Sequence, residues 1–401
     1  MTPSLCFAGK SPVRIWGLTP RQRVMHVLAA AGEHPVAAAP DALENGADVL
    51  IFRADVLLDD RLVQYVADTP DLMLQTDAGG KRVTVAAHVP ARIAARVFSD
   101  IEALAEVPEI PGIRVETPQT LAVSFQARLL KFDPPFALPV TGQNRRELER
   151  RLFAWSYKGV TDLVTKWAWP LPARWAVGQC VRLGIRPNQV TAVSLVLVVL
   201  AGLLFARGHF GWGLLAGWIM TFLDTVDGKL ARVTVTSSRF GHYFDHLIDL
   251  VHPPAWYILW GIGLSVFRPG PIWFDTGAVL WYIVAGYIAG RLAEGLFQWR
   301  LGRFGIFCWR PADSYFRLVT ARRNPNLLLL TLSVLAGRPD LGLLAVAFWT
   351  VLTSGILLLR LAAGAVERRQ RGALRSWLAD AGSDAWAGTL AARLFTRRSA
   401  A

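Results

Sequence analysis

Long apolar runs recur through the second half of the chain and predict helices that cross a membrane. The runs are Asn188–Ala206, Trp212–Thr225, Phe244–Phe267, Ala278–Phe297, Leu327–Ala336 and Leu341–Ala362. The second and the fifth run are shorter than the ~20 residues that a helix needs to span a bilayer. The second run reaches that length only by including Asp224 and Asp227, and charges at Arg338 and Asp340 follow the fifth. The pattern therefore predicts about six transmembrane helices, with five as the alternative.

The first 140 residues have a different pattern, in which short apolar stretches alternate with polar ones. Ala47–Arg53 and Arg82–His88 predict strands, whereas Arg21–Gly32 and Ala91–Val107 predict helices. Strands that alternate with helices indicate a small α/β layer. The predicted fold class is therefore mainly α: a polytopic membrane protein preceded by a small soluble α/β domain.

Two segments of unusual composition separate these parts. Lys131–Val140 is Pro-rich and is typical of a linker. Gln143–Trp169 interleaves Arg and Lys with Trp and other apolar residues, which predicts an amphipathic helix in the membrane interface, with an ordinary surface helix as the alternative. We expect a soluble domain over 1–140, a linker and interfacial helix over 141–180, a membrane domain over 181–371 and a cytoplasmic tail over 372–401.

The charge balance favours a membrane as the partner of this chain. Lys and Arg number 43 against 30 Asp and Glu, a net charge of +13, which suits either nucleic acid or an anionic membrane surface. The basic residues flank the apolar runs instead of forming one stripe, so we expect membrane lipid and no nucleic acid. With six spans every basic cluster falls on one side, and the positive-inside rule makes that side cytoplasmic. No cleaved signal peptide is expected either, so we predict a multi-pass protein of the cytoplasmic (inner) membrane with both termini in the cytoplasm.

Four aspartates flank the junction of the second and third runs: Asp224, Asp227, Asp245 and Asp249. Their helical spacing places each pair on one face, so two adjacent helices can direct four carboxylates into one cleft. One carboxylate at the centre of a membrane helix costs roughly 2.5–3.5 kcal/mol, which requires shallow placement, protonation or bound cations. Clustered oxygen ligands suit Mg²⁺ or Mn²⁺, and four carboxylates suit two such ions. In the alternative, they lie in a solvated loop and pair with Lys229, Arg232 and Arg239.

These aspartates belong to a longer string. It reads Asp224-x-x-Asp227-Gly228-x-x-Ala231-Arg232, then eight residues, then Gly241-x-x-x-Asp245-x-x-x-Asp249. In residues and spacing the string resembles the signature of the CDP-alcohol phosphotransferases. The resemblance extends over roughly 143–371 and includes 185–191 and 320–326. It implies an integral membrane enzyme, usually with six transmembrane helices and usually a homodimer.

The resemblance also implies roles for individual residues. Asp224, Asp227 and Asp245 would ligate two divalent ions, and Asp249 would lie near the second ion and act as the general base. The ions would hold the diphosphate of a CDP-linked donor while the acceptor hydroxyl attacks the phosphorus next to the alcohol and CMP leaves. The active site would face the cytoplasm. The expected nucleotide pocket is lined by Gly228, Ala231, Arg232, Gly241, Asn188 and Thr191.

Two groups of these residues have simpler alternatives. Asn is a good helix N-cap, so Asn188 before an apolar run is also explained as the start of a helix. Arg317, Arg322 and Arg323 are either positive-inside charges or a basic pocket for the phosphate of an acceptor, because Arg binds phosphate in a bidentate manner.

The N-terminal segments Lys10–Arg21 and Ala47–Val56 resemble pieces of a sugar-nucleotidyltransferase domain, which is fused ahead of the membrane part in some inositol-phosphate phosphotransferases. The Gly-rich nucleotide loop of such domains is absent, and Asp55 alone stands where a metal ligand is expected. We therefore expect a degenerate, noncatalytic domain that docks on the membrane part or aids dimerisation.

The function predicted from these features is transfer of a substituted phosphate from a CDP-alcohol, in the first instance CDP-diacylglycerol, to a second alcohol in phospholipid synthesis. One alternative is a CDP-polyol-dependent inositol-phosphate phosphodiester synthase. Another is a noncatalytic membrane scaffold or a cation pathway, although a conduction path would spread its polar groups across the membrane.

Overall fold

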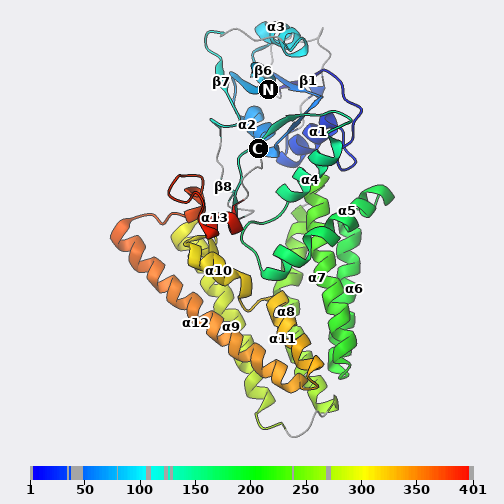
Figure 1. The fold of residues 1–401 in the computed structure, drawn as a ribbon, viewed down its shortest axis with the longest axis vertical. Helices are drawn as coiled ribbons and strands as arrows, with labels where there is room; N and C mark the ends of the chain where they lie inside the picture. Colours follow the sequence, from blue (N-terminus) through cyan, green and yellow to red (C-terminus); the bar gives the residue numbers. More distant parts are fainter. Residues whose placement is uncertain are drawn as a thin grey trace.

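The chain is elongated, with an α/β domain at one end and long helices at the other (Figure 1). The computed structural model describes residues 3–33, 36–37, 48–78, 80–104, 110–121, 125–126, 130–236, 239–267 and 272–396. The side chains of 36–37, 78, 125 and 239–247 lie outside that description. The α/β end corresponds to the mixed pattern of the first 140 residues, and the helical end to the apolar runs.

A six-stranded sheet forms the centre of the α/β domain, in the order β2-β1-β3-β6-β5-β7. Its strands are β1 (Ser4–Ala8), β2 (Val36–Ala37), β3 (Val49–Arg53), β5 (Leu72–Ala78), β6 (Lys81–Val89) and β7 (Arg114–Glu116). The strand β6 runs antiparallel to both of its neighbours, and the other pairs are parallel. The two strands predicted from the sequence, now β3 and β6, are therefore confirmed as adjacent strands of one sheet.

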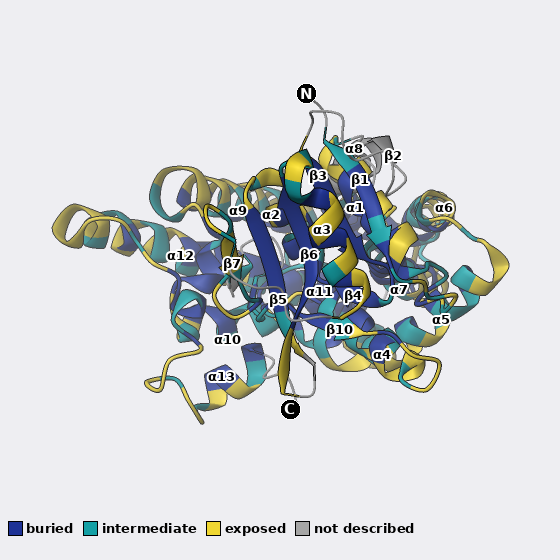
Figure 2. Cartoon of the chain, turned by 90° about the horizontal axis from the view of Figure 1, so that it is seen from above, coloured by how far each residue is buried: buried dark blue, intermediate teal, exposed yellow. Residues whose placement is uncertain are grey.

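Three helices cover the two faces of this sheet (Figure 2). The helices α1 (Pro20–Ala31) and α2 (Asp60–Asp68) share a core with Leu50 and Phe52 of β3. The helix α3 (Ala91–Glu102) packs on Val49 and Ile51 from the opposite side. Successive strand residues point to opposite faces, so a strand covered on both faces is apolar throughout. The predicted helices α1 and α3 are confirmed, whereas α2, β1 and β5 were not predicted from the sequence pattern.

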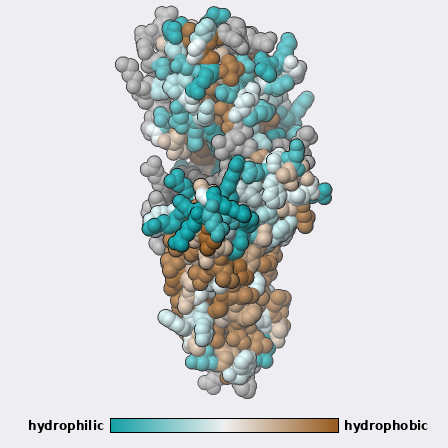
Figure 3. Space-filling model, turned by 90° about the vertical axis from the view of Figure 1, so that its left-hand side faces the viewer, coloured by the Kyte–Doolittle hydropathy of each residue, from teal (hydrophilic) through white to brown (hydrophobic). Residues whose placement is uncertain are grey.

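Six helices of the second half match the six predicted apolar runs. They are α6 (Pro187–Ala206), α7 (Phe210–Val233), α8 (Arg239–Phe267), α9 (Thr276–Leu296), α11 (Arg323–Leu335) and α12 (Pro339–Arg371). Four described segments are long and apolar enough to cross a membrane: Pro187–Ala206, Ile248–Phe267, Thr276–Gly302 and Pro339–Arg371. The two others, α7 and α11, are those whose runs are short or carry charges. Hydrophobic side chains gather over the helical end in Figure 3, and the mainly helical fold of a membrane protein is confirmed.

The segment expected to be one interfacial helix is divided. The structure has α4 (Arg145–Trp155), a short π-helical turn at Val164–Ala168 and α5 (Pro170–Leu183). Leu148 and Leu152 of α4 are buried in a core that includes Phe136, so the apolar face of α4 covers protein. The large apolar side chains that remain exposed lie on the turn and on α5: Trp167, Leu171, Trp175 and Leu183. The exposed apolar surface expected of an interfacial helix is therefore found on α5 and not on α4.

The Pro-rich stretch is part of the α/β domain. Its strand β10 (Ala137–Pro139) pairs antiparallel with β4 (Val56–Leu58). A further short pair joins β8 (Phe125–Gln126) to β9 (Lys131–Phe132). The stretch was expected to be a free linker, but its backbone groups complete a small second sheet.

The two domains meet where α7 ends. Arg23 of α1 is buried, and its Nη1 donates to the carbonyl of Val233 across 2.8 Å, while Nη2 pairs with Asp60 at 2.8 Å. The last carbonyls of a helix lack partners within the helix, so this guanidinium caps α7. The α/β domain is docked on the helical domain through this contact.

The C-terminal residues fold back onto the protein, although a tail was expected. Trp377 is buried, and its Nε1 donates to Ser314 Oγ of α10 (Pro311–Val319) across 3.0 Å. The last helix, α13 (Leu390–Phe395), buries Phe395 in the same core. Residues 372–396 thus hold α10 in place beside the long helices.

Candidate active site

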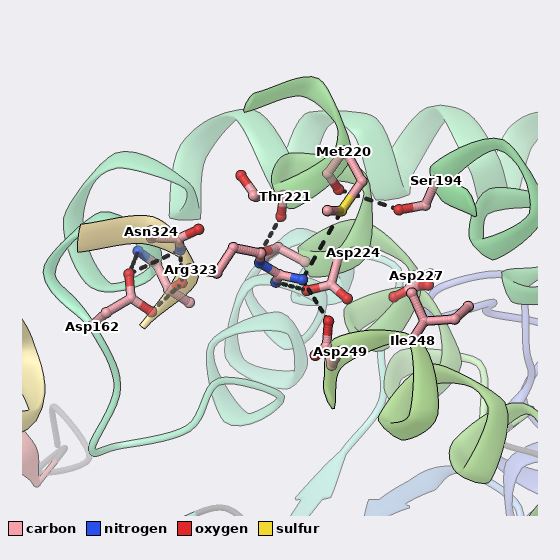
Figure 4. A network of polar contacts seen from close by, with 12 residues as sticks. Asp162, Ser194, Met220, Thr221, Asp224, Asp227, Ile248, Asp249, Arg323 and Asn324 are labelled. Carbon is pink, nitrogen blue, oxygen red and sulfur yellow. Dashed lines mark hydrogen bonds and ion pairs between the residues drawn. The ribbon is translucent and has the colours of Figure 1, made fainter. Parts of the chain in front are cut away.

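One guanidinium joins the two acidic helices. Arg323, at the start of α11, donates from Nη1 to Asp249 Oδ1 of α8 across 2.6 Å and from Nη2 to Asp224 Oδ2 of α7 (Figure 4). Two carboxylates that converge on one cation share one local environment. Asp224 and Asp249 are therefore brought together as the sequence predicted, and the cation between them is Arg323, which was expected in the acceptor pocket and not between the aspartates.

Asp227 has a different partner. It is only 6% exposed, and its Oδ2 accepts a hydrogen bond from Thr191 Oγ1 of α6 across 2.7 Å. Thr191 also lies 3.1 Å from the carbonyl of Pro187. Asn188 is exposed within the first turn of α6, whose N-cap residue is Arg186, so Asn188 is not the N-cap that the alternative required. Thr191 is thus placed against the acidic helix α7.

The residues that follow Asp227 show why the signature contains a glycine. A Cβ added to Gly228 would lie 3.2 Å from Arg232 Nη2, so the guanidinium rests closely against the glycine backbone. Ala231 is partly buried beside it. Lys229 is buried, with Nζ 3.6 Å from the centre of the Tyr157 ring and 3.3 Å from the Ser156 carbonyl. Lys229 therefore packs against the chain between α4 and α5. In the alternative interpretation, it would have been solvated and paired with the aspartates.

Two predicted residues cannot be placed in the same way. Gly241 and Asp245 belong to the first turns of α8, but their side-chain environment lies outside the described residues. Among the side chains that are described, no group of three or more His, Cys, Asp or Glu converges as a metal site. These residues still fit a hard divalent ion, which prefers carboxylate oxygens as ligands. Asp224 and Asp249 are close enough to share one cation, Arg323, and Asp227 lies one helical turn from Asp224.

A pair of prolines shapes the backbone at Asp249. Pro253 and Pro254 lie inside α8, and each lacks the N–H that would bond to the carbonyl four residues earlier. The freed carbonyls are those of Asp249 and Leu250. Tyr287 of α9 donates its hydroxyl toward both, at 3.4 Å from Asp249 O and 3.0 Å from Leu250 O. A neighbouring helix thus supports the backbone that carries the expected general base.

The loop between α4 and α5 contributes a buried carboxylate that the sequence analysis missed. Asp162 accepts from Thr165 N at 3.0 Å, from Thr165 Oγ1 at 2.9 Å and from Asn324 Nδ2 at 3.0 Å. Burial acts to raise the pKa of Asp162, but Arg317 and these hydrogen bonds outweigh it and hold the pKa below its ordinary value. Asn324 directly follows Arg323, so Asp162 fixes the position of the guanidinium that bridges the acidic helices (Figure 4).

The three arginines expected to form an acceptor pocket differ in their ion-pair partners. Arg323 is held by Asp224 and Asp249, and Arg322 pairs with Glu294 of α9. Arg317 and Arg322 both lie 5.6 Å from the centre of the Phe307 ring. Among the described residues, the buried Nη1 of Arg317 has no hydrogen-bond partner. Burial, together with the charge of Arg322, lowers the pKa of Arg317 to about 10. Arg317 is therefore the member of the trio best placed to receive an anion.

Lys158 completes the basic side of the site and was also missed. Lys158 keeps an exposed surface, but partial desolvation, followed by the charges of Arg232 and Arg317, lowers its pKa, while Asp224 and Asp249 act in the opposite direction. The charge of Lys158 is therefore within electrostatic range of these aspartates and arginines. The only signal in the sequence was its position in the Arg- and Lys-rich segment before α5, which spacing alone cannot relate to Asp224.

The comparisons with known proteins agree with the signature. Residues 185–301 match the family model of the CDP-alcohol phosphatidyltransferases. The chain is 34% identical over 123 residues to a phosphatidylinositol phosphate synthase of Mycobacteroides abscessus, which is 28% of this chain and 56% of the relative. It is 40% identical over 86 residues to an archaetidylinositol phosphate synthase of Pyrococcus horikoshii, which is 21% of this chain and 43% of the relative.

A third relative, a phosphatidylinositol phosphate synthase of Streptomyces avermitilis, is 34% identical over 87 residues, 21% of this chain and 36% of the relative. The chain thus spans about half, or less, of the curated relatives that it matches. The matched region contains the complete acidic signature, so the predicted resemblance is confirmed for residues 185–301.

Proposed function

We propose that this chain uses its CDP-alcohol phosphatidyltransferase domain to transfer a substituted phosphate from a CDP-alcohol to the hydroxyl of a second alcohol, with release of CMP, in phospholipid synthesis. The observation that carries this proposal is the convergence of Asp224 and Asp249, from two helices of the matched domain, on one cation. Carboxylates in a membrane helix require a compensating positive charge, and the divalent ions bound together with the substrate would provide it.

The reaction assigns one step to each part of the site. The acceptor oxygen forms a bond to the phosphorus that carries the donor alcohol, and the bond from that phosphorus to the CMP oxygen breaks. Asp249 takes the proton of the acceptor hydroxyl, and CMP leaves with the bonding electrons. Lys158 and Arg232, whose charges influence each other, compensate the negative charge of the donor phosphates.

Divalent ions, Mg²⁺ or Mn²⁺, would be held by Asp224, Asp227, Asp245 and Asp249. Two such ions supply electrostatic stabilisation of the diphosphate and of the leaving phosphate. Arg323 pairs with both Asp224 and Asp249 in this structure, so it would have to release one or both carboxylates for them to ligate the ions. Gly228, Ala231 and Gly241 would let the nucleotide approach the helix backbones, with Asn188 and Thr191 at the edge of the pocket.

We infer that the donor is CDP-diacylglycerol and that the acceptor is an inositol phosphate. Two of the relatives are named as phosphatidylinositol phosphate synthases, and a third as an archaetidylinositol phosphate synthase. The half-buried Arg317, whose Nη1 has no hydrogen-bond partner among the residues that the structure describes, supports an acceptor that carries a phosphate. Arg322 would assist, although Glu294 already neutralises it in part.

We also propose that the site faces the cytoplasm and that the protein forms a homodimer in the cytoplasmic membrane. Arg368, Arg369 and Arg371 end α12, at the end of the helices that carries the α/β domain, which supports that orientation by the positive-inside rule (Figure 1).

The α/β domain would be noncatalytic. Asp55, its candidate metal ligand, is held by Arg53 in a bidentate pair of 2.7 and 2.6 Å, which leaves little negative charge for a cation.

The test is incubation of the full-length protein, purified in detergent, with radiolabelled CDP-diacylglycerol, Mg²⁺ and a panel of alcohols. The panel contains inositol phosphate, inositol and glycerol phosphate, and a parallel reaction contains a CDP-polyol as donor. We expect a radiolabelled phospholipid and stoichiometric CMP only with CDP-diacylglycerol and inositol phosphate. Product formation with the CDP-polyol alone would overturn the lipid assignment, and no CMP release with any pair would overturn the enzymatic one.

A further inference from the structure

A basic cleft lies outside the candidate active site, between α4, α5 and the turn Ile15–Leu18. It encloses about 660 Å³. Its lining contains five arginines and one carboxylate: Arg145, Arg146, Arg150, Arg174, Arg182 and Glu149. In Figures 1 and 2, α4 and α5 lie side by side next to the start of α6. The cleft therefore concentrates positive charge at the junction of the two domains.

Most of this charge is not compensated by any carboxylate that the structure describes. The one carboxylate, Glu149, pairs with Arg145 across 3.1 Å. In the part of the chain that the structure describes, Arg146, Arg150, Arg174 and Arg182 take part in no ion pair. Guanidinium groups that lie together without carboxylates attract a phosphate, which each of them can bind through two N–H groups.

The walls of the cleft are fixed by contacts that do not involve the four arginines. Trp16 Nε1 donates to the carbonyl of Glu149 across 2.8 Å, and its ring lies 5.7 Å from that of Phe153. Gly17 has φ +83°, and a Cβ there would lie 3.1 Å from Val181 Cγ1 of α5. The turn is thus held against both helices, and the cleft is formed without a ligand.

The apolar surface beside the cleft places it at a membrane. The helix α5 leads through Gly184 directly into α6, the first segment that can cross a membrane. Leu171 and Leu183 of α5 are each 72% exposed, and Trp175, which also lines the cleft, is 69% exposed. Trp is enriched at the level of lipid headgroups, where its ring is apolar on one side and solvated on the other.

We propose that this cleft binds the headgroup phosphate of an anionic phospholipid, separately from substrate. The arginines provide the phosphate contacts, and the exposed face of α5 provides an apolar surface for the adjoining acyl chains. A soluble phosphate compound has no acyl chains that could contact this apolar surface. We therefore favour a lipid as the ligand. None of the residues placed in the candidate active site lines the cleft.

The experiment uses the full-length protein in an uncharged detergent. Its thermal unfolding is followed while phosphatidylglycerol, phosphatidylcholine or glycerol phosphate is added. The variant is Arg150→Gln with Arg174→Gln. The matched control is Arg92→Gln with Arg96→Gln, which removes the same charge from the exposed face of α3.

We expect phosphatidylglycerol to raise the Tm of the parent and of the control over the same range of lipid concentration. For the same rise of Tm, the cleft variant should need at least about fivefold more phosphatidylglycerol. Phosphatidylcholine and glycerol phosphate should have little effect. A cleft variant that responds like the control would overturn the proposal, provided that its Tm without lipid equals that of the control. Equal effects of glycerol phosphate and phosphatidylglycerol would overturn the assignment to a lipid. If the cleft variant unfolds at a lower Tm, native mass spectrometry of the bound lipids at low temperature makes the same comparison.

Discussion

Arg323 and Asp249 form an ion pair of 2.6 Å between Nη1 and Oδ1, and the same guanidinium also holds Asp224. Three helices, α7, α8 and α11, therefore meet at one charge cluster. An arginine in this position keeps the acidic helices together without a metal, because it supplies the positive charge that two neighbouring carboxylates require.

Replacement of this cation is expected to increase the dependence on a metal. In Arg323→Gln the carboxylates of Asp224 and Asp249 face each other without a shared positive charge, so bound Mg²⁺ should stabilise the variant more than the parent. The measurement is the rise of Tm on addition of Mg²⁺, with Arg207→Gln, an exposed arginine at the end of α6, as the control. An equal rise in the parent and in Arg323→Gln would contradict the shared role of Arg323 and the metal.

Removal of the proposed general base should stop the reaction without unfolding the protein. Asp249→Asn keeps the size of the side chain but cannot take the proton of the acceptor, so we expect CMP release to fall by about 100-fold or more. The protein should stay folded and Mg²⁺ should still bind, although more weakly, because Asp224, Asp227 and Asp245 remain as ligands. Asp384→Asn, at an exposed position, is the control. Activity of Asp249→Asn within a fewfold of the parent would remove Asp249 from this role.

Tyr287 is expected to act through the backbone of α8. Tyr287→Phe removes the donor to the Leu250 carbonyl, which Pro254 already deprives of its helical partner, and the loss of one such hydrogen bond costs about 0.5–1.5 kcal/mol. We expect a lower Tm and a kcat reduced about fivefold with an unchanged KM. Tyr282→Phe on the same helix is the control, since Tyr282 is 59% exposed. The interpretation fails if both variants behave alike.

The contact between Asp162 and Asn324 should be visible as an energetic coupling. Asp162→Ala and Asn324→Ala each remove the hydrogen bond that positions Arg323, and we expect each to reduce CMP release about tenfold. Because the two side chains share one interaction, the double variant should lose little more than the more severely affected single variant. Strictly additive losses in the logarithm of the rate would show that they act independently.

The pH dependence of substrate binding should report Lys158. Its pKa is lowered, so it loses its proton and its charge at a pH below the ordinary lysine value of about 10.4. We therefore expect the KM for the CDP-linked donor to rise as the pH increases through the alkaline range. In Lys158→Arg the charge persists, and the rise should move to higher pH or disappear. An identical alkaline profile for the two proteins would exclude Lys158 as its source.

The sequence by itself determined the elements and the chemistry of the acidic signature. Apolar runs of sufficient length predicted α6, α8, α9 and α12, because a helix in a bilayer must be apolar along its whole length. The spacing of Asp224 and Asp227 is enough to place them on one helical face, because residues three apart are neighbours on the surface of any α-helix.

The tertiary structure decided which side chains meet. Arg323 contacts Asp224, which is 99 residues away in the sequence, and Asn324 contacts Asp162, which is 162 residues away. Trp377 is buried against α10, which lies in a different segment of the chain. Periodicity describes which face of an element is apolar, but it contains no information on which other element covers that face. Partners distant in sequence follow from the packing of whole helices, and for that reason the positions of Lys158, Asp162 and Tyr287 emerged only from the fold.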